Sequence, residues 1–118
     1  MIHTYTTMRP TIAGRTSSRD QNILISEYVK EKKFAFTIPV PEMVFPGCYL
    51  QLYALCSRAV HGDILIMFSI FQLAEHQERL SLFRHIFTKF SEVHFARENL
   101  VVHSLDQFSI IEIHLSTL

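Results

Sequence analysis

The segment 71–91 is the longest part of the chain that follows a single clear period. Its apolar residues recur at the spacing of a helix, and its polar residues fall on the opposite side. A stripe of this width is typical of an amphipathic helix that packs on a core. Glu78 near the start and Lys89 near the end suit the helix dipole. The pattern predicts one long helix from Leu73 to His94, with an apolar face made of Leu80, Leu82, Phe83, Ile86, Phe87, Phe90 and Val93.

The size and composition of the chain are those of one folded domain. It has 118 residues, of which 48% are hydrophobic, and ten of them are Phe. A chain of this length can bury a core without disulfides or metal ions. Its eleven basic residues balance eleven acidic ones, so the formal net charge is zero. Because a dedicated binder of duplex DNA has a basic excess, we expect a folded domain that does not bind DNA.

Two sequence features bear on the compartment. Cys48 and Cys56 are the only cysteines, and the alternating run between them predicts a strand that holds them too far apart to bond. Two buried, reduced thiols fit a cytoplasmic protein. The longest apolar run, Ile64 to Phe71, is far shorter than the roughly 20 residues of a membrane span. The sequence therefore predicts a cytoplasmic protein without a membrane span.

The chain divides into an arm and one domain. Residues 1–21 contain the helix breakers Pro10 and Gly14, which predict a flexible N-terminal arm and disfavour the helix of a targeting segment. Residues 22–118 form a single α+β domain in this interpretation, and its continuously apolar run Asp63 to Phe71 predicts a central strand buried on both faces. We expect a small twisted antiparallel sheet, or a partly open β-barrel, of about six strands, packed by the one long helix. The expected strands are 22–29, 34–38, 48–56, 63–71, 99–105 and 108–115.

The histidines and carboxylates follow no metal-binding or catalytic motif. Two zinc ligands on one helix face need a spacing of about three or four residues, whereas His76 and His85 are nine apart. Asp63 beside His61 suits a turn, and the sequence has no serine elbow and no cysteine motif with a placed histidine. We therefore predict no catalytic residue, no metal site and no cofactor, and a protein that is not an enzyme. A small enzyme with a histidine-based site is the alternative.

Two arginines are the candidate ligand-binding residues. Arg15 and Arg19 stand at the two ends of the stretch RTSSR, within the predicted arm. Two guanidinium groups on a flexible arm can hold a phosphate, or the edge of a guanine, in a forked geometry. Two solvated arginines without a ligand would show the same pattern.

Three stretches together resemble a PilZ domain, a small β-barrel whose typical members bind cyclic di-GMP. Phe34 to Leu55 is similar to the middle hairpin of that family. Phe71 to Phe87 is similar to its last strand and C-terminal helix. Arg15 and Arg19 match the paired arginines of the family's first ligand motif. The resemblance covers roughly residues 15–92 and implies the barrel architecture.

The second ligand motif of that family, Asp-x-Ser-x-x-Gly, is degenerate in this chain. Ser26 agrees with it, whereas Leu24 stands in place of the Asp and Val29 in place of the Gly. The resemblance therefore implies a non-enzymatic regulatory or adaptor domain that binds a protein partner, with a homodimer allowed. The alternative that it implies is a cyclic di-GMP receptor that uses Arg15, Arg19 and Ser26.

Overall fold

The computed structural model describes residues 2–6, 18–32, 49–70, 76–107 and 109–112. A 3-10 turn lies near the C-terminal end, and residues 109–112 are helical. None of the helices in these ranges has the length and the apolar character that crossing a membrane requires. The elements are, in chain order, β1 (Ile2–Tyr5), α1 (Ser18–Glu31), α2 (Leu50–Arg58), β2 (Asp63–Met67), α3 (His76–Ile86), β3 (Phe90–Phe95), β4 (Leu100–Val102) and the 3-10 turn (Leu105–Gln107).

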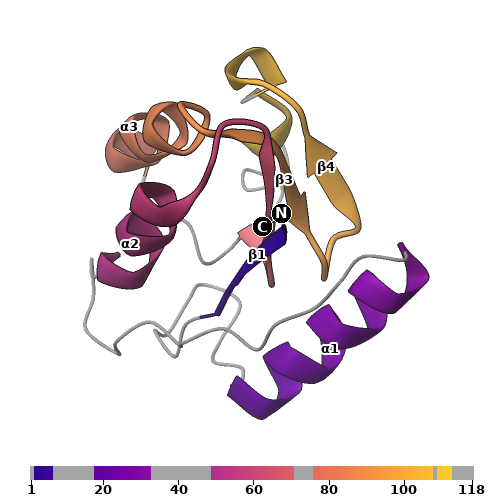
Figure 1. The fold of residues 1–118 in the computed structure, drawn as a ribbon. Coiled ribbons are helices and arrows are strands. Elements are labelled where there is room, and N and C mark those ends of the chain that lie inside the picture. The colour runs from indigo at the N-terminus through magenta and orange to yellow at the C-terminus, as the bar shows by residue number, and fades with distance from the viewer. Residues whose placement is uncertain (1, 7–17, 33–48, 71–75, 108, 113–118) are drawn as a thin grey trace.

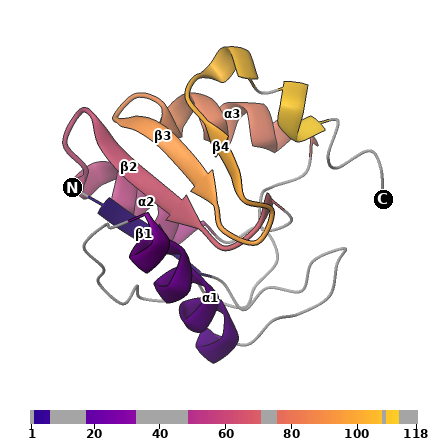
Figure 2. The same ribbon diagram turned by 90° about the vertical axis from the view of Figure 1, so that its right-hand side faces the viewer.

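The four strands form one open sheet in the order β1-β2-β3-β4. β1, β2 and β3 run parallel, with Tyr5 beside Met67 and Met67 beside Phe95, whereas β4 is antiparallel to β3. Parallel neighbours need a crossover connection, and helices supply it here. α1 and α2 come between β1 and β2 in the chain, and α3 comes between β2 and β3. Helices consequently lie on both faces of the sheet (Figure 1 and Figure 2).

The central strand β2 confirms the predicted strand 63–71 over its first part. β2 is paired on both sides, to β1 and to β3. Leu65 points into one core and Ile66 into the other, and both are fully buried. A strand covered by helices on both faces accounts for the continuous apolar run. The predicted strand 99–105 is confirmed only at Leu100–Val102, which is β4, and Leu105 begins the 3-10 turn.

The two faces of the sheet carry separate cores. α2 and α3 cover one face, and α1 stands alone on the other (Figure 1). Alternating side chains of each strand supply both cores, as the pleat requires. The first core includes Leu52, Cys56, Leu65, Met67, Leu82, Phe83, Ile86, Phe90, Val93 and Phe95. The second includes Ile25, Tyr28, Val29, Ile66, Phe68 and Ala96.

α1 occupies the stretch where the sequence predicts a strand over 22–29, so that prediction is wrong. Ile25, Tyr28 and Val29 are buried and recur three and four residues apart, which is the spacing of one helix face. Lys30 in the last turn suits the helix dipole. The β-branched residues of this stretch favour a strand weakly, and packing of the helical stripe on the sheet outweighs that preference.

α2 likewise replaces the predicted strand 48–56. Leu52 and Cys56 are four residues apart and buried, whereas Tyr53 between them is 43% exposed. Leucines that alternate over a few positions fit a strand and a helix equally, so the short pattern did not discriminate. Cys56 is a free, buried thiol, and Cys48 lies outside the described residues.

The predicted helix from Leu73 to His94 is wrong in its second half. α3 ends at Ile86 and β3 begins after a short turn, in which the amide of Lys89 donates to the carbonyl of Ile86 at 3.2 Å. Phe90 and Val93 extend the helical stripe by their spacing, yet they also suit a strand, because aromatic and β-branched side chains pack well on a sheet. The predicted apolar face is therefore divided between Leu82, Phe83 and Ile86 on α3 and Phe90 and Val93 on β3.

The two ends of the chain also differ from their predicted forms. Ile2–Tyr5, expected in the arm, is an edge strand of the sheet, and residues 18–21 begin α1. Residues 109–112, expected in a strand, are helical. The predicted strand 34–38 and the rest of the arm, 7–17, lie outside the described residues.

The predicted fold class is therefore wrong. A mixed, open four-stranded sheet flanked by helices takes the place of an antiparallel sheet or barrel packed by one long helix. Two of the stretches that were expected to be strands, 22–29 and 48–56, lie in helices between β1 and β2, and helices between strands allow neighbouring strands to run parallel.

Candidate functional site

The three parallel strands end together at one edge of the sheet, called here the carboxyl edge. Tyr5, Met67 and Phe95 are register partners at this end. The ladder continues beyond them, since the amide of Arg97 donates to the carbonyl of Phe68 at 2.8 Å. Open parallel sheets bind their ligands outside the carboxyl ends of the strands. The carboxyl edge is therefore where this architecture places a functional site.

Ser69 and Glu98 form the polar centre of the carboxyl edge. The Ser69 hydroxyl, just after β2, donates to Oε2 of Glu98, just after β3, at 2.8 Å. The other carboxylate oxygen, Oε1, accepts the amide of Ile70 at 2.8 Å. A hydroxyl held on a carboxylate is the arrangement in which a base can take the proton of a nucleophile. Ser69 is 1% exposed, whereas Glu98 is half-buried, so the pair lies where the interior meets the surface.

Thr6 brings a second hydroxyl group to the same edge. It follows β1 directly and is fully buried. Its Oγ1 atom makes no hydrogen bond within the part of the chain that the structure describes. Leaving a buried hydroxyl unpaired costs on the order of 1–3 kcal/mol, so such a group calls for an explanation. A water molecule or a bound polar group at the carboxyl edge would satisfy it.

Two arginines lie near this edge: Arg79 forms an ion pair with Glu112, whereas the side chain of Arg97 is exposed. Arg79 of α3 donates through Nε to Oε1 of Glu112 at 2.7 Å and through a terminal nitrogen to Oε2 at 2.9 Å. This forked pair joins α3 to the helical residues 109–112. Arg97 is exposed and adjoins Glu98 in the chain. Its guanidinium group can therefore meet an anion that approaches the edge.

A second group of titratable side chains lies on the sheet face beneath α1. The Tyr28 hydroxyl is 2.6 Å from Nδ1 of His94, and Nε2 of His94 faces Oε2 of Glu92 at 3.6 Å. Oε1 of Glu92 lies 3.3 Å from Nδ1 of His103. The four side chains form a row that runs from the buried helix contact to the surface, where the His103 side chain is 58% exposed.

Burial sets the protonation of this row. It raises the pKa of Tyr28, and the charge of Glu92 raises that pKa further. It lowers the pKa of His94, although Glu92 acts in the opposite direction. Tyr28 is therefore the donor and neutral His94 the acceptor at Nδ1, which leaves the ring proton on Nε2 facing Glu92. The buried contact between Tyr28 and His94 joins α1 to the sheet, so this row has a structural role.

The predicted ligand residues fall on α1 or outside the described ranges. Arg15 lies outside them. Arg19 is exposed in the first turn of α1, and Ser26, seven residues later on the same helix, is half-buried. The described residues do not test a ligand role for these three side chains, which stays a prediction.

Sequence reasoning missed Thr6, Ser69 and Glu98. One signal could have found Ser69, because a small polar residue that directly follows a central apolar strand is a candidate in parallel sheets. Glu98 carries no such signal, since its partner is 29 residues away in the chain. Strand register alone brings the two together.

The residues that the structure describes offer neither a metal site nor a reactive thiol. Among the described residues, no three metal-binding side chains form a group. Burial raises the pKa of Cys56 to about 11, so its thiol stays protonated at neutral pH and is a weak nucleophile.

The comparisons with known proteins find a similar structure but no similar sequence. Neither the family models nor the curated proteins contain a match to the sequence. The fold is similar to the N-terminal catalytic domain of TP901-1 integrase, with a TM-score of 0.68 at 15% sequence identity. The likeness covers 98% of this chain and 92% of the integrase domain. At this level of identity the two chains share a fold.

This likeness overturns the PilZ interpretation, and the function derived from it is corrected with it. The described strands form an open mixed sheet and not the barrel on which a PilZ-like adaptor, or a cyclic di-GMP receptor, would be built. The neighbour is the catalytic domain of an integrase, which also contradicts the predictions that the chain is not an enzyme and does not bind DNA. The prediction that the chain does not bind DNA rested on a net charge of zero. Net charge does not describe how charges are distributed over a surface.

Proposed function

We propose that the chain acts on DNA, as an enzyme domain of the integrase type. One observation carries the proposal: the likeness to the integrase catalytic domain extends over nearly all of both chains. A shared fold does not establish an activity, so the proposal also needs a site with suitable chemistry. We further place the protein in the cytoplasm, where a buried free thiol such as that of Cys56 stays reduced.

The carboxyl edge supplies groups that suit chemistry on a phosphodiester. Breaking and rejoining a DNA strand requires a nucleophile, a proton acceptor and cationic groups near the phosphate. The hydroxyl of Ser69 donates to the Glu98 carboxylate, and the exposed Arg97 directly precedes Glu98 in the chain. We assign proton transfer to Ser69 and Glu98, and phosphate binding to Arg97.

Two measurements on the purified chain test this function. Fluorescence anisotropy with a labelled duplex of mixed sequence should show binding that weakens steeply as salt is added. Incubation with supercoiled plasmid should produce nicked or linear DNA on a gel. Lack of binding at low salt would overturn the whole proposal. Binding without any strand breakage would remove the catalytic part and leave a DNA-binding domain.

A further inference from the structure

The edge of the sheet opposite the carboxyl edge carries a group of basic and aromatic side chains. α2 and α3 each precede a parallel strand, so both helices end at this amino edge (Figure 1). Each ends in basic residues, Arg58 on α2 and Arg84 with His85 on α3. We define the basic surface as Tyr53, Arg58, His61, Arg84, His85 and Lys89, of which all but the half-buried Lys89 are exposed.

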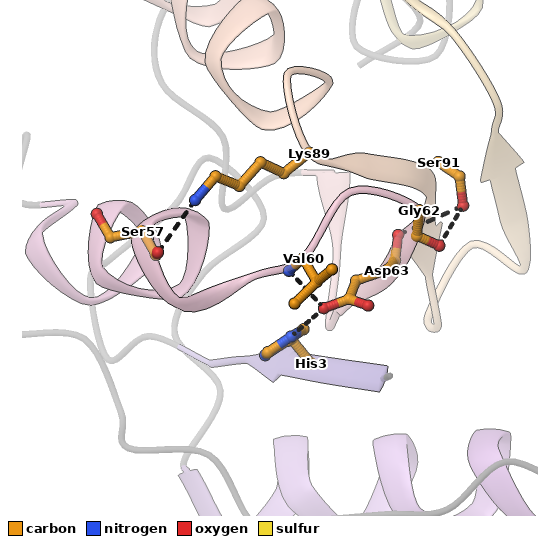
Figure 3. Close-up of polar contacts among 7 residues, drawn as sticks. All are labelled: His3, Ser57, Val60, Gly62, Asp63, Lys89 and Ser91. Atoms are coloured by element: carbon orange, nitrogen blue, oxygen red, sulfur yellow. Dashed lines mark hydrogen bonds and ion pairs between the residues drawn. The ribbon is translucent and has the colours of Figure 1, made fainter.

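Direct contacts join the two helix ends into one surface. Nζ of Lys89, at the start of β3, donates to the carbonyl of Ser57 on α2 at 3.0 Å, and Figure 3 shows this side chain reaching across. The ring of Tyr53 on α2 packs edge-on against His85 on α3, with centroids 5.0 Å apart. The basic surface is therefore continuous over α2 and α3.

Figure 3 also draws the carboxylate of Asp63, which is bound by groups of the fold itself. Oδ2 of Asp63 accepts the amide of Val60 at 2.9 Å and lies 2.9 Å from Nε2 of His3 (Figure 3). The hydrogen bond from Val60, followed by that from His3, lowers the pKa of Asp63 to about 2. Its charge is thus balanced within β1 and the loop before β2. No carboxylate of the described chain forms an ion pair with Arg58, Arg84 or Lys89.

The helix dipoles explain part of this arrangement. Cations are favourable at the carbonyl end of a helix by about 0.3–1 kcal/mol each, and Lys89 acts in this way on α2. Arg58 and Arg84 point into solvent instead. Two guanidinium groups without an ion-pair partner among the described residues, beside an exposed tyrosine hydroxyl, suit a partner that presents a row of phosphate groups, as DNA does.

We infer that the basic surface at the amino edge binds the phosphate backbone of duplex DNA. The inference rests on the proposed function. It gives the domain a second DNA contact, at the amino edge, in addition to the one at the carboxyl edge. β2 has five residues, and at about 3.3 Å per residue such a strand separates the two edges by roughly 16 Å. An enzyme that joins DNA segments handles more than one of them, and two separated surfaces on one domain provide for that.

A matched pair of double variants tests this surface. Arg58→Ala with Arg84→Ala removes two exposed charges from the basic surface. Lys30→Ala with Lys32→Ala removes two exposed charges at the C-terminal end of α1, on the other face of the sheet. Net charge changes equally in both, so only position differs. Affinity for a labelled duplex is measured by anisotropy over a range of salt concentrations, and melting temperatures establish that each variant is folded.

The basic-surface variant should lose roughly tenfold or more in affinity. The slope of the logarithm of its affinity against the logarithm of the salt concentration should become shallower, by the amount that about two lost phosphate contacts produce. The α1 variant should bind like the parent. Replacement by lysine, Arg58→Lys with Arg84→Lys, should retain most of the affinity.

Three outcomes overturn the inference. Equal affinities of the two alanine variants would show that this surface does not bind DNA, while binding by the parent would leave the proposed function intact. Equally tight binding of polyglutamate would show that any acidic chain is accepted. A parent that fails to bind DNA would overturn both the inference and the proposed function.

Discussion

Glu98 is the residue that organises the carboxyl edge. Its two carboxylate oxygens hold the Ser69 hydroxyl and the Ile70 amide, each at 2.8 Å. It therefore joins the loop after β3 to the loop after β2. Bonds from two donors to an ionised carboxylate are stronger than bonds between neutral groups. This residue has a structural task as well as its proposed part in proton transfer.

Ser69→Ala should abolish the proposed chemistry and spare the proposed binding. Loss of the hydroxyl and of its proton transfer should lower the rate of plasmid nicking by roughly 100-fold or more. The affinity for duplex DNA should stay within a factor of about two, because phosphate contacts dominate it. Ser91→Ala is the control, since Ser91 lies at the amino edge, where its hydroxyl donates to the carbonyl of Gly62 (Figure 3). Full nicking activity in Ser69→Ala would show that the Ser69 hydroxyl takes no part in the reaction.

His94 should make the stability of the domain depend on pH. Burial lowers the pKa of His94 in the folded chain below the ordinary value of 6.5. Below that value the unfolded chain binds a proton that the folded chain does not, so acid favours unfolding. The free energy of unfolding should therefore be largest above pH 6.5 and should fall as the pH is lowered through the window beneath it.

Urea unfolding at a series of pH values measures this dependence. His94→Gln should flatten the slope between neutral and mildly acid pH, because it removes the group that titrates differently in the two states. His61→Gln removes one exposed histidine and serves as the matched control. An unchanged slope in His94→Gln would show that other groups cause the acid sensitivity.

α3 is held to the sheet by one face of its last two turns. Leu82, Phe83 and Ile86 are each at most 2% exposed, and the Phe83 ring stacks on Phe87 with centroids 5.9 Å apart. The ring of Phe83 also packs edge-on against Phe95 of β3. This face links the helix to the strand that follows it, so α3 and β3 form one packing unit.

Phe83→Ala should destabilise the domain by about 3–5 kcal/mol, because it removes a buried ring and leaves a cavity. That is a large share of the roughly 5–15 kcal/mol by which domains are stable. Thermal unfolding followed by circular dichroism measures the loss. Ser81→Ala, on the exposed side of α3, should melt close to the parent. A Phe83→Ala protein that melts like Ser81→Ala would show that α3 is not docked through this face.

The molecule as a whole is unequal on its two sides. Within the described ranges, two helices and most of the large buried side chains lie on one face of the sheet, whereas α1 is the helix on the other (Figure 2). Towards β4, the face on the side of α1 carries the polar row of Glu92, His94 and His103. Side chains on strands alternate between faces, so Glu92 and His94 share this face, on which His94 is buried beneath Tyr28 and His103 is exposed.

This difference between the two faces of the sheet should appear in the rates of amide hydrogen exchange. The core beneath α1 is small, so α1 should open without global unfolding, and its amides should exchange faster than those of β2. β2 is paired on both sides and buried on both faces, so its exchange should approach the rate set by global unfolding. Mass spectrometry of peptides from the exchanged protein measures both. Equal protection of α1 and β2 would show that the domain opens as one unit.

Some elements could be predicted from the sequence because their patterns fit one structure only. The run that forms β2 is apolar without interruption and too short for a buried helix, so it indicates a central strand. Leu82, Phe83 and Ile86 keep a helical period on a stretch with acidic residues before it and basic residues after it. Both signals lie within a few neighbouring residues, and the chain satisfies them in almost any compact arrangement.

Local sequence patterns could not determine the structure of α1, of α2 or of the boundary between α3 and β3. Short runs such as the one around Leu52, or the one from Phe87 to Val93, fit a helix and a strand almost equally. The choice then depends on which face the rest of the chain can cover, and that is a long-range energy. The carboxyl edge has the same origin, because parallel register sets Ser69 beside Glu98. Local patterns carry information about their own neighbours in the chain, whereas pairing and packing join residues that the sequence keeps far apart.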